Sequence, residues 1–502
     1  MKQSNIKIVE KIKTILLVVL FFATVLLLYL FWENAAENPF RLRNFIGSAE
    51  VEEIPLVEDT VVPTEILVGF GNEVYTVIVD GREALWRDAV KELQVFGDAA
   101  GGQSANTFVG DITKEKYMEA MSYPSIQFQF NYDIPFSEFC DFFDIQKSPS
   151  AEMIESVSTV AYSALSKESI LICQKNPERY FAIVADQDYT GFQAMIERIE
   201  AQDYASYYTA ATIFGSGVSN STLLPLALQS DLVAVPYEKE SERPDADKVK
   251  DLAESFFGES FDFIRKTTDV QGNVTYMYGY GKKVFTVYAN GTFEYKEELQ
   301  PGNGEKTGFF ASLDIAQRFV AAHGSWNSLD GTDMTAYLRK VVPVQSERQS
   351  GYKFIFGMKI GSQNVYFQKS APIIVEVVGG QVTHYRRDMI DMDKRAVTAY
   401  NSGELEATFD PVAVLTENYA YIYEQMTAAG ITLPPMDQME ETFDQIAEKI
   451  TAMEIGYVRS GFEEDGREME LLPCYRISFG KNVSLYFDLF NDAAPISSES
   501  EE

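Results

Sequence analysis

A run of nineteen residues, Thr14–Trp32, constrains this chain more than any other feature, because none of them is charged and nearly all are large and apolar. As an α-helix the run would be roughly 28 Å long, close to the hydrocarbon thickness of a bilayer. Residues 1–13 before it contain four lysines and one glutamate, and an excess of cations marks the cytoplasmic side of a span. The sequence therefore predicts a cytoplasmic stub (1–13), a single transmembrane helix (14–32) and an extracytoplasmic body.

A cleaved signal peptide is the alternative interpretation of the same segment. The apolar run exceeds the roughly 7–15 residues typical of signal peptides. Tyr29 and Trp32 suit the membrane interface, and Asn34-Ala35-Ala36 is a poor cleavage site. These features favour a retained anchor.

One face of the predicted helix is a candidate contact surface for a partner helix. Helices in hydrocarbon associate by close packing, so small and weakly polar positions matter most. Ala23 and Thr24 are such residues in mid-span, and Leu16, Leu20 and Leu27 extend the same face. The alternative is that these side chains face lipid alone.

The charge balance indicates which partners the body avoids. Residues 1–13 carry +3 of the formal net charge of −33, which leaves −36 on the rest. Such a surface repels nucleic acid and anionic lipid headgroups and keeps a large body soluble. With 46% hydrophobic residues, the chain can bury several cores, and its length indicates two to four domains.

Cysteine usage indicates that disulfides do not hold the fold. The three cysteines, Cys140, Cys173 and Cys474, are an odd number and lie in apolar stretches. We expect buried or unpaired thiols, with a Cys140–Cys173 bridge as the alternative.

The first part of the body is expected to be a stalk (33–60) followed by an N-terminal α/β domain (61–235). The domain begins with a hairpin, TEILVGF and EVYTVIV, and an amphipathic helix, EALWRDAVKEL. Further short strands and helices alternate along it, including helices at Lys114–Met121 and Gly191–Ile199. The charged, Pro-bounded segment PYEKESERPDAD is the natural boundary.

The rest of the body repeats one pattern, an amphipathic helix followed by strands with Gly-containing turns. The helices are KVKDLAESFF, LDIAQRFVAAH and ETFDQIAEKI. The pattern predicts helix-on-antiparallel-sheet units in a middle α+β domain (240–395) and a C-terminal α+β domain (405–491), with α+β as the overall class. The acidic tail (492–502) is expected to be disordered.

Residues able to carry chemistry are scarce. Only two histidines occur: His323 suits the end of a helix, and His384 lies in a strand-like segment. No HExxH and no closely spaced Cys pair occurs, which argues against a zinc site. We therefore expect no catalytic residue, no metal and no cofactor, and a role in binding or regulation rather than catalysis.

Several segments carry a resemblance to a known family. They are the N-terminal apolar helix, PTEILVGFGNEVYTVIVDGREALWRDAVKEL, SIQFQFNYDIPFSEFCDFF, APIIVEVVGGQVTHYRRDMI and LLPCYRISFGKNVSLYFD. In this layout the chain resembles the YycH-type regulators that accompany an essential sensor histidine kinase of the cell wall in Gram-positive bacteria.

The resemblance implies a single-pass protein of the cell membrane with a three-part extracytoplasmic body. It also implies a sensor histidine kinase and a YycI-like membrane protein as partners, and no catalytic residues. The alternative is an envelope enzyme or polymer-binding protein, with aromatic strands such as TYMYGY presented to glycans.

Overall fold

The computed structural model describes residues 54–500 with gaps at 102–107, 148, 186–189, 203, 216, 227, 231–234, 238–245, 302–306, 324–325, 327–333, 347–348, 362, 368–370, 389–406, 461–468, 481–482 and 490–493. The chain divides after Ile54, and the unit Pro55–Glu502 contains every described helix and strand. The predicted stub, span and most of the stalk lie outside the described residues. At the end of the stalk, a short helix, α3 (Val57–Thr60), forms.

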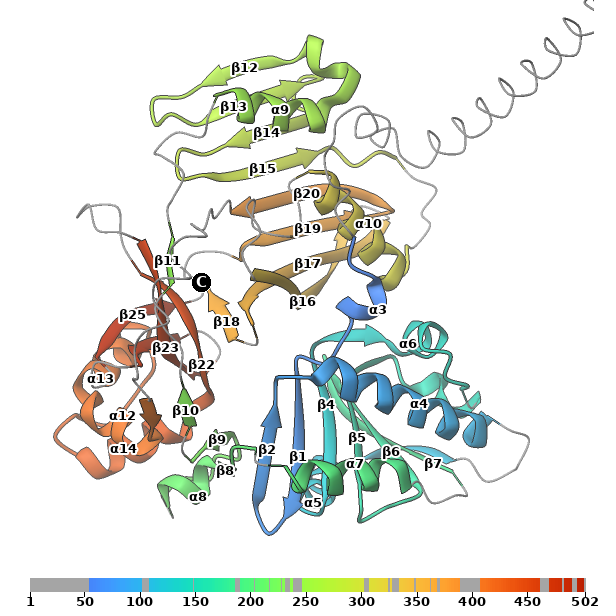
Figure 1. The fold of residues 1–502 in the computed structure, drawn as a ribbon, viewed down its shortest axis with the longest axis vertical. Helices are drawn as coiled ribbons and strands as arrows, with labels where there is room; N and C mark the ends of the chain where they lie inside the picture. Colours follow the sequence, from blue (N-terminus) through green and yellow to red (C-terminus); the bar gives the residue numbers. More distant parts are fainter. Residues whose placement is uncertain are drawn as a thin grey trace, which may run out of the picture. The chain divides into compact units, whose positions relative to one another are not determined.

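The first large element is a nine-stranded sheet (Figure 1). Its strands are β1 (Glu65–Gly71), β2 (Val74–Ile78), β3 (Phe108–Ile112), β4 (Ser125–Pro135), β5 (Ser156–Ser163), β6 (Ser169–Lys175), β7 (Glu178–Val184), β8 (Tyr207–Thr209) and β9 (Leu223–Pro225). They lie in the order β3-β7-β6-β5-β4-β1-β2-β8-β9, and each described pairing is antiparallel. The predicted α/β class of this part is therefore wrong, because its helices connect strands that pair antiparallel.

Helices cover both faces of this sheet. The long helices α4 (Arg82–Gly101) and α7 (Thr190–Glu200) pack on one face, where Trp86 contacts Phe128 and Phe139 in the main core. On the other face, α5 (Lys114–Met121), which has the predicted bounds, forms a smaller core. Strand β5 between the two layers is buried along nearly its whole length.

The second large element is a sheet of fourteen strands. Its strands are β11 (Val235–Tyr237), β12 (Arg265–Thr268), β13 (Val274–Tyr278), β14 (Lys283–Val287), β15 (Thr292–Glu297), β16 (Met334–Ser346), β17 (Gln349–Ile360), β18 (Gln363–Tyr366), β19 (Ile373–Val378), β20 (Gln381–Asp388), β22 (Ile450–Ser460), β23 (Met469–Phe479), β24 (Val483–Asp488) and β25 (Pro495–Ser500). The path runs β12-β13-β14-β15-β20-β19-β17-β18-β22-β23-β24-β25, with β16 on β17 and β11 on β23. Two further strands, β10 (Leu228–Ser230) and β21 (Ala407–Phe409), pair with each other.

The helices on the second sheet agree with the predicted helix-on-antiparallel-sheet units. Helices α9 (Ala246–Phe257) and α10 (Phe309–Ala322) contribute to the main core with the strands of the middle part. Helices α12 (Pro411–Glu417), α13 (Tyr419–Ala428) and α14 (Met439–Glu448) form a separate core with β22–β24. The mixed α+β class with antiparallel sheets is thus confirmed.

The middle and C-terminal parts share the second sheet through one parallel pairing, between β18 and β22. It spans three residue pairs, Asn364–Gly456, Val365–Tyr457 and Tyr366–Val458. A Cβ atom at Gly456 would lie 2.5 Å from the Asn364 carbonyl oxygen, so the close approach requires glycine. The predicted boundaries at 240–395 and 405–491 stay predictions.

The C-terminal residues depart from the predicted disorder of 492–502. Pro495–Ser500 forms β25, which pairs antiparallel with β24 from Val483 to Phe487. Its acidic, Ser-rich sequence argued against structure, but backbone hydrogen bonds to a neighbouring strand do not depend on side-chain type.

Candidate functional site

The predicted partner-contacting face of the span, Leu16, Leu20, Ala23, Thr24 and Leu27, lies outside the described residues. Among the residues that are described, no helix has the length and apolar character needed to cross a bilayer. The transmembrane helix and its contact face therefore stay predictions.

His323 lies where the sequence predicted it, at the C-terminal end of α10. Its ring stacks on Phe256 with centroids 4.3 Å apart and contacts Phe319, and its Nδ1 lies 3.0 Å from the Ser255 hydroxyl. Burial lowers the pKa of His323 to about 3, so the ring is neutral at physiological pH. His323 packs the core between α9 and α10.

His384 lies on β20 and contacts a neighbouring strand. Its Nε2 is 2.8 Å from a carboxylate oxygen of Glu294 on β15. Burial acts to raise the pKa of Glu294, but hydrogen bonds from Lys296, His384 and Tyr288 hold it below its usual range. In the described part of the chain, no group of three or more His, Cys, Asp or Glu side chains is placed to bind a metal.

The three cysteines are unpaired, as predicted, with Cys140 and Cys474 buried and Cys173 partly buried. Burial raises the pKa of the Cys140 thiol to about 12 and that of Cys173 to about 11. Such thiols are poor nucleophiles at neutral pH.

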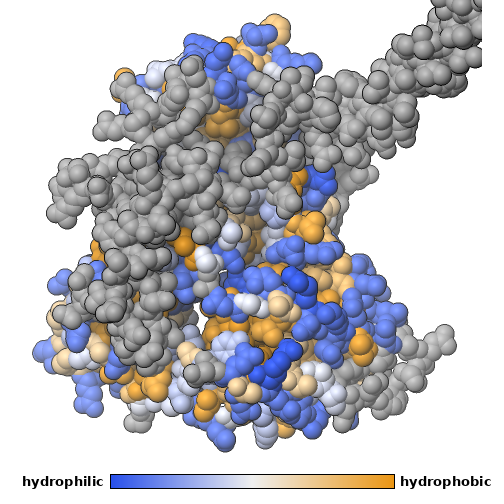
Figure 2. Space-filling view, viewed as in Figure 1, coloured by the Kyte–Doolittle hydropathy of each residue, from blue (hydrophilic) through white to orange (hydrophobic). Residues whose placement is uncertain are grey.

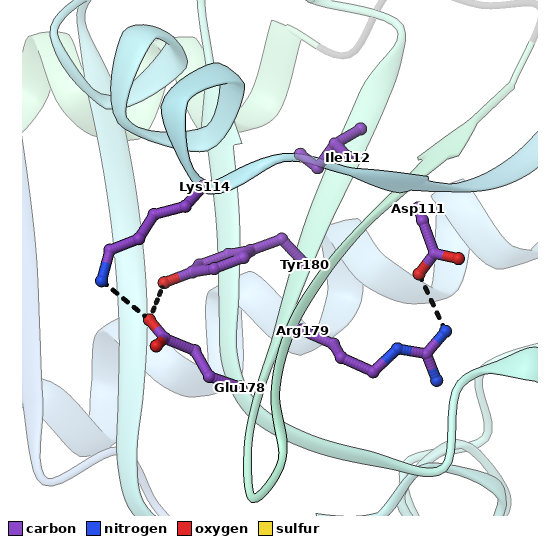
Figure 3. Close-up of a pocket in the computed structure, with 6 residues that line it drawn as sticks. All are labelled: Asp111, Ile112, Lys114, Glu178, Arg179 and Tyr180. Atoms are coloured by element: carbon purple, nitrogen blue, oxygen red, sulfur yellow. Dashed lines mark hydrogen bonds and ion pairs between the residues drawn. The ribbon is translucent and has the colours of Figure 1, made fainter.

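A shallow hollow of about 270 Å³ lies at the end of the β6–β7 hairpin, beside β3 and α5 (Figure 3). Arg179 donates to Asp111 over 2.9 Å and Lys114 to Glu178 over 3.0 Å, while the Tyr180 hydroxyl donates to the same carboxylate. These bonds lower the pKa of Glu178, the one from Tyr180 most. Each charge is thus matched within the hollow, which leaves little to attract a charged ligand.

A cluster of charged and tyrosine side chains brings together residues from the first sheet, the middle part and the C-terminal part. We call it the charged joint; it consists of Glu65, Arg82, Glu83, Tyr207, Tyr337, Lys359, Tyr366, Glu454 and Arg476. Glu454 on β22 accepts hydrogen bonds from Arg476 (2.9 Å) and from the Tyr366 hydroxyl (3.2 Å). Lys359 on β17 pairs with Glu83 of α4 over 3.5 Å, which links the middle part to the first sheet.

Among the carboxyl groups of this joint, that of Glu65 at the start of β1 has the largest shift in pKa. Burial raises its pKa to about 7, and the charge of Glu454 acts in the same direction, while Arg82 and Lys175 act against it. Burial and the charges of Glu65 and Glu454 also raise the pKa of Tyr207 to about 12. The charged joint therefore holds a carboxyl that titrates near neutral pH.

A second contact between the first sheet and the middle part is mainly apolar, and we call it the aromatic joint. Phe142 of α6 (Phe136–Phe142) stacks on Phe310 of α10 with centroids 3.9 Å apart, and Tyr132 stacks on Phe309. The carboxylate of Glu138 on α6 accepts a hydrogen bond of 2.6 Å from the backbone N–H of Phe309. An acidic side chain thus caps α10 from another part of the fold.

A third contact joins the end of the first sheet to the C-terminal part. The Ser219 backbone N–H and hydroxyl both bond the Glu448 carboxylate, at 2.7 and 2.8 Å. Asn220 donates to the carbonyls of Ala447 and Ile450. Nothing in the sequence near Ser219 and Asn220 indicates a partner more than two hundred residues away.

Comparisons with known proteins concern both the N-terminal part and the whole fold. Residues 10–159 match the model described as the YycH protein, N-terminal domain; the match contains the predicted span, β1–β4 and α4–α6. The fold is similar to that in the crystal structure of YycH from Bacillus subtilis, with a TM-score of 0.50 and 12% sequence identity, covering 89% of this chain and 99% of that one. No curated protein matches.

The architecture thus defines an α+β protein with two large sheets, of a kind already known in a solved structure. Both comparisons agree with the resemblance noted from the sequence: residues 10–159 are similar to the N-terminal domain of YycH proteins, and the fold is similar to that of a YycH protein.

Proposed function

We propose that this chain is a membrane-anchored accessory regulator of a sensor histidine kinase that controls cell-wall metabolism. In this proposal it acts through transmembrane and extracytoplasmic contacts with the kinase and a YycI-like partner. The match of residues 10–159 to the YycH N-terminal domain carries the proposal, because it contains both the predicted anchor and the start of the extracytoplasmic body.

The absence of a catalytic arrangement in the described residues supports regulation rather than chemistry. His323 packs against Phe256 in a core, and His384 bonds Glu294 on a neighbouring strand. Burial keeps the Cys140 thiol protonated, and the charged side chains of the hollow at β6–β7 pair with one another. A chain of this kind transmits information by binding, so its partner surfaces are its functional sites.

Topology is the first test. Reporter fusions after Phe40 should be active outside the membrane and inactive inside. A released body that begins near Ala36 would instead establish a cleaved signal peptide and overturn the anchor.

The partner-contacting helix face is the second test. Replacing Ala23 with Ile should weaken partner-helix association by about 1 kcal/mol, because a bulky side chain keeps two backbones apart. Val18→Leu is the matched control, since it adds volume on another face. The measurement is a bilayer association reporter, read together with kinase output. A scrambled helix of equal hydrophobicity that preserved both readouts would move the regulatory surface to the extracytoplasmic parts.

A further inference from the structure

The β12–β14 end of the second sheet carries two large aromatic side chains that the fold leaves in solvent. Phe263, directly before β12, is 79% exposed, and Tyr280, in the turn between β13 and β14, is 108% exposed. All four residues of β12 are exposed as well. On the face shown in Figure 2, this region is mainly hydrophilic, with a small apolar spot towards its outer end.

Strand register brings these two aromatic residues to the same end of the hairpin. Arg265 pairs with Met277 and Tyr278 with Lys283, so the residue before β12 and the β13–β14 turn lie at the same end of these strands. We call Phe263, Tyr280 and the neighbouring cations Arg265, Lys266 and Lys282 the hairpin tip.

The turn holds Tyr280 outward in an uncommon conformation. Gly279, Tyr280 and Gly281 have φ values of 61°, 59° and 99°. Glycine adopts these angles freely, but a bulky aromatic residue does so at a cost. No packing compensates this cost in the fold, since the ring is exposed.

The charges at the hairpin tip differ from those of the chain as a whole. Residues 263–283 contain four cations and one carboxylate, that of Asp269, in a chain whose net charge is −33. That carboxylate caps its own turn at the other end of the hairpin, through bonds to Gln271 and Asn273. The acidic neighbours at the tip itself are Asp262, Glu298 and Glu297, and Glu297 pairs with Lys283 over 3.1 Å.

We propose that the hairpin tip docks on an anionic phospholipid surface, with Phe263 and Tyr280 entering the interface and Arg265, Lys266 and Lys282 meeting headgroup phosphates. The proposal rests on the proposed function, which keeps the body tethered to a membrane. Aromatic residues favour the membrane–water interface, and neighbouring Lys and Arg side chains add attraction to anionic lipid. The acidic remainder of the body repels such a surface, so contact would be confined to this tip.

The tip's form favours lipid over a folded protein partner. Specific protein interfaces need a broad complementary surface, whereas the tip offers two separate aromatic side chains on a turn and a strand start. A fluid interface accommodates projecting side chains without a matching groove.

The test uses the full-length chain in lipid nanodiscs of phosphatidylcholine, with or without phosphatidylglycerol. Tyr280→Trp places a fluorescent reporter at the tip, and the unsubstituted chain in the same discs provides the background from Trp32, Trp86 and Trp326. With phosphatidylglycerol present, brominated acyl chains should quench the added emission about twofold, and the emission should shift to the blue. The same chain carrying Arg265→Glu and Lys282→Glu should lose both effects.

Equal, solvent-like emission from Tyr280→Trp in both lipids would overturn the proposal. Quenching that persists without phosphatidylglycerol would overturn the role of the cations. If the emission of Tyr280→Trp shifted to the blue only after another protein was added, whichever lipid was present, the tip would bind a protein instead. Association of the chain with the discs and quenching of Trp32 test the membrane anchor independently of the tip. If the anchor does not insert, sedimentation of the same chain with phosphatidylglycerol vesicles shows whether the tip binds lipid by itself.

Discussion

The aromatic joint and the charged joint both connect the first sheet to later parts of the chain, but the first consists mainly of apolar rings and the second of charged and tyrosine side chains. At the aromatic joint, Phe142 stacks on Phe310 and Phe309 is fully buried in a core that continues into the middle part. At the charged joint, Glu65 and Glu454 carry like charges, and Arg82 and Arg476 each leave a buried Nε atom without a hydrogen-bond partner. The first contact depends mainly on apolar packing, whereas the second depends on protonation.

This contrast indicates which contact holds the structure and which can respond. Apolar packing is costly to open, because each separated ring returns to water. Partly paired charges compensate their desolvation incompletely and can exchange protein partners for water. We therefore expect the first sheet to stay fixed on α10 while its contact with β22 adjusts.

Removing the central ring of the aromatic joint should have the largest effect. Phe309→Ala should lower the free energy of unfolding by about 3–5 kcal/mol, because it leaves a cavity among Tyr132, Tyr352 and Phe354. Urea unfolding at equilibrium measures the change. Phe263→Ala is the matched control and should change stability little, since that ring is exposed. Equal losses from the two variants would mean that the aromatic joint is not a core.

The helix cap across the aromatic joint should contribute less. Glu138→Gln weakens the bond to the Phe309 N–H and removes a negative charge from the α10 N-terminus, so we expect a loss of about 1–2 kcal/mol. Glu119→Gln, an exposed change on α5, is the control for lost charge alone. A loss of equal size in the control would assign the effect to net charge.

The charged joint should make stability depend on pH. Glu65 has a pKa of about 7 in the folded chain against 4.5 when unfolded. Between these values the folded state holds a proton that the unfolded state has lost, so stability should fall as the pH rises through this window. Glu65→Gln should remove this contribution and stabilise the chain at pH 8 by on the order of 1 kcal/mol.

Thermal unfolding at pH 5 and pH 8 measures that difference, with Glu152→Gln at an exposed site as control. An unchanged pH profile in Glu65→Gln would show that another group titrates there.

The smallest expected effect is at the Tyr366–Glu454 hydrogen bond. Tyr366→Phe removes a hydroxyl 3.2 Å from a carboxylate that keeps its bond to Arg476, so the loss should be about 0.5–1.5 kcal/mol. Urea unfolding at equilibrium measures the loss, and an unchanged free energy of unfolding would show that the Tyr366 hydroxyl does not stabilise the charged joint.

Sequence patterns predicted the elements whose side chains repeat with a clear period. Helix α5 begins and ends as expected, and the β1–β2 hairpin turns where Asn72 and Glu73 adopt positive φ. Strand β5 was missed because its Ser, Ala and Val residues are buried on both faces and show no alternation. Strand β22 was missed because it follows α14 without a turn signal.

The contacts at the two joints could not be predicted from the sequence, for a different reason. Glu65, Arg82 and Glu454 are ordinary charged residues in their local context, and only the packing of distant segments brings them together. The sequence around Glu138 predicts only that it lies in a helix, α6, and nothing near it indicates that its carboxylate caps α10. Contacts of this kind are properties of the tertiary fold, which local periodicity does not encode.

The parallel pairing of β18 with β22 has a consequence for the order in which the protein assembles. Its three residue pairs join positions 364–366 to 456–458, so some ninety residues must be synthesised between its two halves. Long-range pairing is slow to form, and a chain that folds from its N-terminus completes early parts first. The edge of β18 would then stay unpaired until β22 is synthesised. An unpaired strand edge can pair with another chain, so misassembly of the nascent protein is expected first at this edge, and a chaperone that covered it would prevent that pairing.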